Sequence, residues 1–331
     1  MTGLVAVTGA EGFIGSHLVE TLVEQGHRVR AMAQYNSFDS RGWLADLPAD
    51  VLDQVEVILG DVRDPASVRD LIGRAEVVYH LAALIAIPYS YRAPNSYVET
   101  NVVGTLNVLE AVRSLGTARL VHTSTSETYG TARTVPITED HALQTQSPYA
   151  ASKAAADKLA ESYHDSFALP VVTLRPFNTF GPRQSARAFI PTVVGQIAAG
   201  AAEVTVGALE PTRDFTFVKD TAAAFVAAGR APASEVVGQV LNAGSGKEIS
   251  MGRLAGEIAA LMGREVTFRS DPARHRPAKS EVMRLVCDST KLRRRTGWQP
   301  RHTLRDGLKI TIEWFLDAAN LSRYRTTDYI V

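Results

Sequence analysis

The chain has 331 residues, of which 45% are hydrophobic and 21% charged, as in ordinary globular enzymes. Its 35 basic and 35 acidic residues cancel to a net charge of zero, which argues against a nucleic-acid-binding protein and against attraction to an anionic membrane. The single cysteine, Cys287, excludes an internal disulfide and argues against a cysteine-based zinc site, and we predict no bound metal. No apolar run approaches the ~20 residues of a membrane span and no secretory signal opens the chain, so we expect a cytoplasmic protein.

Short apolar runs alternate with helical patterns over the first half of the chain. Leu4–Val7 shows no polar alternation, as expected of a parallel strand buried on both faces. Further strands are expected at His27–Ala33, Val55–Leu59, Val77–His80, Arg119–His122, Val171–Leu174 and Val240–Asn242. Helices are expected at Ser16–Gln25, Ala93–Leu115, Pro148–Ala168 and Phe189–Gly200. This alternation predicts an α/β fold, a Rossmann-type doubly wound parallel sheet with right-handed crossovers.

The pattern loosens after Arg175, where prolines and glycines interrupt it. We therefore predict two domains, because a single core rarely grows with a chain of this length. Residues 1–175, together with about 216–243, would form the doubly wound domain, and residues from about 176–215 and 244–331 a smaller C-terminal lobe. The basic cluster Lys291–Arg295 is interpreted as the solvated end of a helix.

A glycine-rich turn follows the first predicted strand. Gly9, Gly12 and Gly15 have the spacing G-x-x-G-x-x-G between a strand and a helix. In dinucleotide-binding folds the first glycine permits a tight turn, the second lets the backbone approach a pyrophosphate, and the third lets the helix pack on its strand. The helix N-terminus supplies the anion site. We predict a tightly bound NAD or NADP at this turn, also contacted by Phe13 and Ile14.

Positions after the next three strands extend the predicted cofactor site. Asp61 follows the third strand, where a carboxylate can meet an adenine amino group. Ala33 stands where an acidic residue would bind the ribose 2′-hydroxyl. Because that absence removes repulsion of a 2′-phosphate, and Asn36, Ser37 and Arg41 offer donors, NADP is slightly favoured over NAD. The remaining predicted cofactor contacts are Val62, Leu81, Ala82, Ala83 and Pro176.

Two stretches carry groups suited to chemistry. The fifth strand is followed by Thr125-Ser126-Glu127, and ligands of open α/β sheets bind outside the carboxyl ends of the strands. Tyr149 and Lys153 lie one helical turn apart on the same face of a predicted helix. An ammonium beside a phenol is expected to lower the pKa of Tyr149 and make it a usable base. These five residues are the predicted catalytic residues, and Tyr149 and Lys153 are also predicted to contact the cofactor.

With these motifs the sequence resembles the extended short-chain dehydrogenases/reductases that act on nucleotide sugars, over essentially the whole chain. Further matching motifs are Gly60-Asp61, Arg175-Pro176-Phe177-Asn178, Arg213-Asp214-Phe215 and Asn242-Ala243-Gly244. The resemblance implies that Tyr149 is the base, that Lys153 holds the cofactor ribose and that Thr125 binds the sugar 4-hydroxyl. It also implies that Asn178 and Arg213 contact the substrate diphosphate. The predicted substrate-binding residues are Asn178, Arg187, Ile190, Arg213 and Arg276.

Within this family, Thr125-Ser126-Glu127 resembles the 4,6-dehydratases, especially the GDP-mannose type; the glucose type carries an aspartic acid where Ser126 stands. A narrower resemblance is to dehydratases of nucleotide-linked N-acetylglucosamine in legionaminic acid pathways. It is carried by Tyr35–Phe38, Gly181–Arg187, Pro211–Asp214, Arg276-Pro277 and Ser280–Val282. The resemblance implies transient oxidation of the sugar at C4, removal of the C5 proton by Glu127 and loss of water from C6.

Three alternatives stay open. A nucleotide-sugar 4-epimerase needs the tyrosine, lysine and threonine but no base at C5. A UDP-glucuronate decarboxylase needs an arginine near C5, which Arg183 or Arg187 would provide. A non-catalytic cofactor sensor on the same fold would be expected to lose some of these groups. Helices at 93–115 and 148–168 carry apolar residues on more than one face, and the family resemblance implies that they pair in a homodimer.

Overall fold

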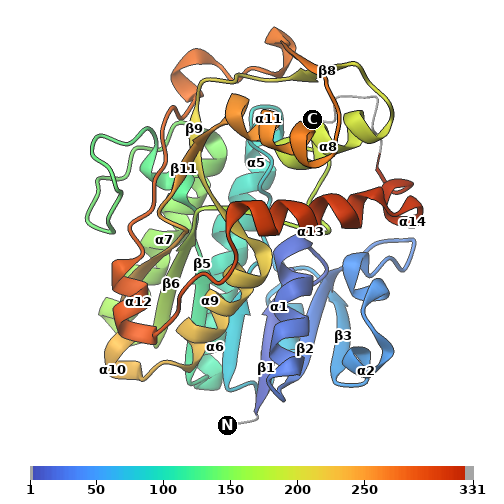
Figure 1. The fold of residues 1–331 in the computed structure, drawn as a ribbon. Helices are drawn as coiled ribbons and strands as arrows, with labels where there is room; N and C mark the ends of the chain where they lie inside the picture. The colour runs from blue at the N-terminus through green and yellow to red at the C-terminus, as the bar shows by residue number, and fades with distance from the viewer. Residues whose placement is uncertain (1–2, 325–331) are drawn as a thin grey trace.

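The computed structural model describes residues 3–324 and is built around a seven-stranded parallel sheet of order β10-β6-β5-β4-β1-β2-β3 (Figure 1). The strands are β1 (Leu4–Thr8), β2 (Arg28–Gln34), β3 (Val55–Gly60), β4 (Val77–His80), β5 (Arg119–Thr123), β6 (Val171–Pro176) and β10 (Val240–Ala243). The chain order reverses between β1 and β4, the point at which open α/β sheets bind ligands. The predicted Rossmann-type sheet and its seven predicted strands are confirmed.

Helices cover both faces of this sheet. On one face α1 (Phe13–Glu24) packs against α9 (Val218–Arg230), while α3 (Pro65–Ile72), α6 (Gly104–Leu115) and α7 (Pro148–Phe167) cover the other. Successive residues of a strand point to opposite faces. Accordingly Val5 and Val7 belong to the apolar core on the side of α1 and α9, and Ala6 belongs to the core on the side of α3, α6 and α7.

A second group of elements lies beyond the carboxyl ends of the central strands, in the upper part of Figure 1. β7 (Asn178–Phe180), β9 (Thr212–Phe217) and β11 (Glu248–Ser250) form one small sheet, and β8 (Glu203–Val206) pairs with β12 (Thr267–Ser270). α8 (Phe189–Ala198), α11 (Met251–Leu261) and α13 (Leu304–Leu316) enclose an apolar core with them. The boundaries of the two predicted domains stay a prediction.

The helix expected at Ala93–Leu115 is interrupted. It consists of α5 (Pro94–Tyr97), a π-helical stretch (Val98–Val103) and α6. Within the wide turn, buried Asn101 exchanges two hydrogen bonds with the backbone of Leu84 at 2.8 and 2.9 Å and donates to Ser152 Oγ at 2.9 Å. These contacts tie the π-helical stretch to the loop after β4 and to α7. The interruption was not predicted, because a buried polar residue does not show in the spacing of apolar residues.

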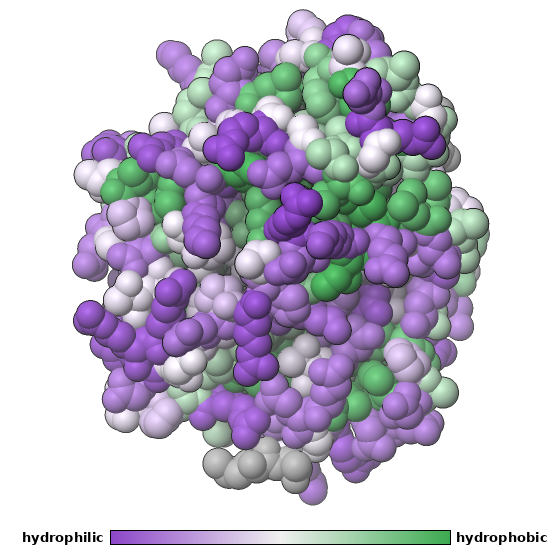
Figure 2. Space-filling view, in the orientation of Figure 1, coloured by the Kyte–Doolittle hydropathy of each residue, from purple (hydrophilic) through white to green (hydrophobic). Residues whose placement is uncertain are grey.

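Figure 2 shows mostly hydrophilic side chains on this face, with apolar ones gathered beside α13. Between residues 3 and 324 there is no helix with both the length and the apolar character needed to cross a membrane, and no cluster of three or more acidic, histidine or cysteine side chains suited to a metal ion. The cluster Lys291–Arg295 lies in α12 (Thr290–Thr296) with Arg293 and Arg294 exposed, as predicted.

Candidate active site

The glycine turn has the geometry that a dinucleotide pyrophosphate requires. Gly9 has a φ of +65°, and a Cβ there would lie 2.7 Å from the Ala82 nitrogen. At Gly15 a Cβ would lie 2.1 Å from the Gly9 oxygen, so both positions need glycine. α1 begins immediately after Gly12 without a side-chain cap or an acidic residue in its first turn. Its first N–H groups are therefore left to bind an anion.

Thr8, at the end of β1, holds the loop after β4 beside this turn. Its Oγ1 accepts hydrogen bonds from the Leu81 and Ala82 N–H groups at 3.1 Å and shares one with His80 Nδ1 at 2.8 Å. The predicted contacts Leu81, Ala82 and Ala83 are all half-buried here. The structure thus brings them together with the glycine turn. Pro176 is buried at the end of β6, and Phe13 and Ile14 pack partly against the apolar cores.

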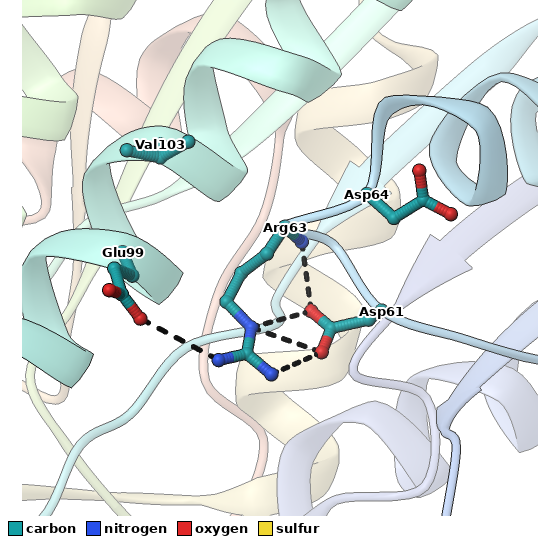
Figure 3. Close-up of a pocket in the computed structure, with 5 residues that line it drawn as sticks. All are labelled: Asp61, Arg63, Asp64, Glu99 and Val103. Carbon is teal, nitrogen blue, oxygen red and sulfur yellow. Dashed lines mark hydrogen bonds and ion pairs between the residues drawn. The ribbon is translucent and has the colours of Figure 1, made fainter.

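Asp61 lines a pocket with Arg63, Asp64, Glu99 and Val103 (Figure 3). The Asp61 carboxylate accepts hydrogen bonds from Arg63 Nη2 at 2.6 Å and from Arg63 Nε at 3.0 Å, which hold the pKa of Asp61 below its usual range. Glu99 lies 3.7 Å from Arg63 on the other side. Any adenine amino group at Asp61 would share this carboxylate with the guanidinium.

The stretch Thr125-Ser126-Glu127 lies just after β5 and beside α7. Thr125 caps the short helix Ser126–Tyr129 by accepting a hydrogen bond from the Glu127 N–H at 3.3 Å. The Tyr149 phenol also hydrogen-bonds to Thr125, and it lies within reach of the Glu127 charge. Ser126, Glu127, Tyr149 and Lys153 are all at most 9% exposed. Thr125 is half-buried, so the predicted catalytic residues form a largely buried cluster at the carboxyl end of the sheet.

The expected lowering of the Tyr149 pKa is wrong for this structure. Burial raises the pKa of Tyr149 above its ordinary value, the hydrogen bond with Thr125 opposes that rise, and the negative charge of Glu127 adds to it. Burial also lowers the pKa of Lys153 to about 8, against the attraction of Asp157. Removal from water is the largest cause of the shift for each group, and the spacing of two residues along a helix does not reveal it.

A buried polar network surrounds Asp157, one helical turn after Lys153 on α7. Asp157 accepts hydrogen bonds from Ser124 Oγ at 2.5 Å and Arg175 Nη2 at 2.7 Å, and its other oxygen lies 3.1 Å from His122 Nε2. Burial opposes ionisation of Asp157, but His122 and Arg175 outweigh it and hold its pKa well below the usual range. The network anchors α7, which carries Lys153, to β5, to Ser124 after it and to β6.

Two arginines from the second group of elements face the catalytic cluster. Arg276 Nη1 lies 3.4 Å from Glu127 Oε2 and 4.0 Å from Glu281 Oε1. Arg213, on β9, is buried and donates from Nη2 to Glu281 Oε1 at 3.3 Å. Arg213 and Arg276, two of the predicted substrate-binding residues, thus lie near Glu127. The ion pair between Arg276 and Glu127 was not predicted, because 149 residues separate them.

The other predicted substrate residues differ in their surroundings. Asn178 Nδ2 is buried and has no hydrogen-bond partner within residues 3–324, so it retains a donor for a ligand. Arg187 is exposed. Ile190 is 1% exposed and belongs to the apolar core around α8, so its contact with a substrate stays a prediction. Arg183 donates to both Glu20 oxygens at 2.8 and 2.9 Å, an ion pair with α1.

The loop after β2 offers less to a 2′-phosphate than the sequence suggested. The Asn36 side chain donates to the Gln34 and Ser40 carbonyls at 3.1 and 2.8 Å and accepts from the Phe38 and Ser40 N–H groups. Arg41 lies 3.9 Å from Asp39, and Ser37 is exposed. Glu11, an acid inside the glycine turn whose carboxylate reaches the end of β2, was not among the predicted site residues. Its position between Gly9 and Gly12 was the feature of the sequence that could have indicated a cofactor contact.

Comparison with known proteins gives consistent matches over the whole chain. The family model described as GDP-mannose 4,6 dehydratase matches residues 6–311. A UDP-glucose 4-epimerase of Mycolicibacterium smegmatis is 35% identical over 315 residues, 93% of this chain and 97% of the relative. A dTDP-glucose 4,6-dehydratase of Xanthomonas campestris is 32% identical over 335 residues, 94% of this chain and 92% of the relative. The crystal structure of dTDP-glucose 4,6-dehydratase from Streptomyces venezuelae, with NAD bound, aligns with a TM-score of 0.84 at 28% identity, over 96% of this chain and 98% of that one.

These relatives carry both dehydratase and epimerase names at similar identity. The predicted family is confirmed, while the reaction within it is left to the chemistry of the site. This chain belongs to the family of nucleotide-sugar 4,6-dehydratases and 4-epimerases within the extended short-chain dehydrogenases/reductases.

Proposed function

We propose that the protein is a nucleotide-sugar 4,6-dehydratase. The observation that carries the proposal is the buried carboxylate of Glu127, close enough to Tyr149 to raise the pKa of its phenol. A dehydratase needs a base for the proton on C5 beside the group that deprotonates the 4-hydroxyl. A 4-epimerase has no step that uses such a carboxylate.

NAD is the proposed cofactor, as in the Streptomyces venezuelae structure. The glycine turn and the uncapped N-terminus of α1 would receive its pyrophosphate, and Lys153 would bind its ribose. When bound, NAD would accept the hydride from C4 of the sugar and return it to C6. The NADP preference expected from Ala33 finds no support in the loop after β2, where Asn36 is engaged within its own loop.

The proposed chemistry of the protein side chains follows from their arrangement. Tyr149 takes the proton of the sugar 4-hydroxyl as its phenolate; burial raises its pKa, and the positive charge of a bound nicotinamide would favour the phenolate. Thr125 donates a hydrogen bond to the same sugar oxygen as charge develops on it. The 4-ketone acidifies the hydrogen on C5, and Glu127 removes it as a proton. The C6 hydroxyl leaves as water with a proton supplied by Glu127, through Ser126 or a water molecule. As the hydride would return to C6, C5 takes up a proton that comes from solvent. The product is a 4-keto-6-deoxy nucleotide sugar.

A 4-epimerase is the second candidate, and one contact favours it. Arg276 lies 3.4 Å from Glu127, so the guanidinium occupies an oxygen of the carboxylate that a dehydratase would use on C5. The epimerase of Mycolicibacterium smegmatis is also 35% identical. A decarboxylase would need Arg183 or Arg187 to bind the sugar carboxylate. Arg183 is paired with Glu20, so only Arg187 remains for that role.

Mass spectrometry in deuterated water distinguishes these reactions. The purified protein is incubated with UDP-, GDP- and dTDP-linked sugars, including N-acetylglucosamine and glucuronate forms. Loss of one water with deuterium gained at C5 is expected for a dehydratase. An unchanged mass with a new C4 epimer would identify an epimerase, and loss of carbon dioxide from a glucuronate would identify a decarboxylase. The same panel tests the predicted preference for N-acetylglucosamine.

We also propose a homodimer formed through the helical segments at 93–115 and 148–168. Val98 and Val103 are 51% and 41% exposed on the first segment. Ala151 and Ala155 are exposed on α7. Small and apolar side chains on these outer faces suit close helix packing. Light scattering coupled to size-exclusion chromatography measures the mass, and a monomer at micromolar concentration would contradict the proposal.

A further inference from the structure

We propose that Glu11 selects NAD over NADP by accepting hydrogen bonds from the adenosine ribose hydroxyls, a role that Rossmann folds usually give to an acid at the end of β2. The inference rests on the proposed function, since it requires a dinucleotide at the glycine turn. It replaces the expectation that the missing acid at Ala33 favours NADP.

The first argument is the position of the carboxylate. Glu11 lies between Gly9 and Gly12, and its Oε1 accepts a hydrogen bond from the Gln34 N–H at 3.1 Å. The neighbouring Ala10 N–H donates to the Met32 carbonyl at 3.1 Å, which fixes the turn against β2. The Glu11 carboxylate therefore lies at the carboxyl end of β2, although it comes from the turn after β1. Ala33 itself is completely buried in the apolar core and faces no ligand.

The second argument is the unused acceptor. Glu11 Oε2 is buried and has no hydrogen-bond partner among residues 3–324. The loop after β2 closes over the same residue, because the Trp43 N–H donates to the Glu11 carbonyl at 3.0 Å. A buried carboxylate oxygen without a donor is unfavourable, and a ribose 2′-hydroxyl supplies the missing donor. A 2′-phosphate supplies no donor when ionised, and its negative charge would meet that of Glu11.

The third argument is that the loop after β2 offers few donors to bind a 2′-phosphate. Asn36 uses both ends of its amide within its own loop. Arg41 lies 3.9 Å from Asp39, whose charge offsets its own. Burial also raises the pKa of Glu11, which shows that the carboxylate is poorly solvated and would gain from a hydroxyl donor. Of the donors expected for a 2′-phosphate, Asn36 is engaged and Arg41 is paired with Asp39, which leaves the exposed Ser37 hydroxyl against the charge of Glu11.

Binding measurements test the inference without relying on turnover. Isothermal titration calorimetry compares NAD and NADP on the wild-type protein, on Glu11→Gln and on the control Glu24→Gln, which changes an exposed acid at the other end of α1. Glutamine can still accept the hydrogen bond from Gln34, so the turn should keep its fold, which circular dichroism checks. Mass spectrometry of dinucleotide released from the purified protein gives a second readout.

The wild-type protein is expected to bind NAD at least ~10-fold more tightly than NADP, the effect of one hydrogen bond to a charged group. In Glu11→Gln the ratio of the two dissociation constants should shrink by a similar factor, mainly through tighter binding of NADP, while Glu24→Gln leaves it unchanged. A wild-type preference for NADP, or an unchanged ratio in Glu11→Gln, would overturn the inference and leave the proposed function standing. Binding of neither dinucleotide would overturn the proposed function itself.

Discussion

Replacing Lys153 with methionine is expected to stabilise the protein while abolishing its activity. Lys153 is 3% exposed, and burial lowers its pKa from an ordinary value of 10.5 to about 8. At 1.36 kcal/mol per pH unit, holding this ammonium inside the folded protein at pH 7 costs about 3 kcal/mol relative to the unfolded chain. Methionine has a similar length and no charge, so Lys153→Met should raise the free energy of unfolding by about 3 kcal/mol. Asp157 keeps Arg175, Ser124 and His122 as partners.

The pH dependence of this gain provides a separate test. Between about pH 8 and 10.5 the unfolded chain holds the Lys153 proton and the folded protein does not, so the stability of the wild type rises with pH across this window. The methionine variant has no such titration. Its advantage over the wild type is therefore complete below pH 8 and declines toward pH 10.5. Guanidinium denaturation followed by circular dichroism at neutral pH and near pH 10 measures both quantities.

Lys158→Met is the matched control on the same helix. Lys158 is 66% exposed and pairs with Glu161 one turn further along. Loss of such a surface pair should change the free energy of unfolding by less than ~0.5 kcal/mol. The reasoning is refuted if Lys153→Met unfolds more easily than the wild type at pH 7, or if its gain stays the same near pH 10.

Three further changes test the site and its supports. Glu127→Gln should abolish water loss and deuterium incorporation at C5 while C4 oxidation continues, which mass spectrometry and cofactor absorbance follow; C5 exchange at the wild-type rate would exclude Glu127 as the base. Tyr149→Phe should slow C4 oxidation by ~10²–10⁴-fold in single-turnover measurements, the usual contribution of a positioned base, and undiminished reduction of the cofactor would count against its role. Burial opposes ionisation of Glu20, but hydrogen bonds from His17 and Arg183 lower its pKa to about 2. The wild type should therefore lose stability as the pH falls from about 4.5 toward 2, and Glu20→Gln should lose less; equal losses in melting temperature between pH 5 and pH 3 would disprove this.

Much of the fold and part of the site could be predicted because the relevant physics is local. Central parallel strands are rich in apolar residues, and all seven predicted strands became strands of the central sheet. The spacing of Tyr149 and Lys153 places them on one helix face whatever surrounds the helix. Gly9 and Gly15 are required by close backbone approaches within a single strand–turn–helix unit. The sequence by itself therefore determined the sheet, the turn and the pair on α7.

The tertiary structure decided the features that depend on distant segments. Arg276 meets Glu127 across 149 residues and Arg183 meets Glu20 across 163, and no periodicity links such pairs. Glu11 gained its importance only when β2 was placed against the glycine turn, since its partner is the backbone of Gln34. The raised pKa of Tyr149 depends on burial by surrounding elements rather than on the lysine beside it. Long-range pairing and burial are properties of the whole packed chain, and they set the charges with which this site works.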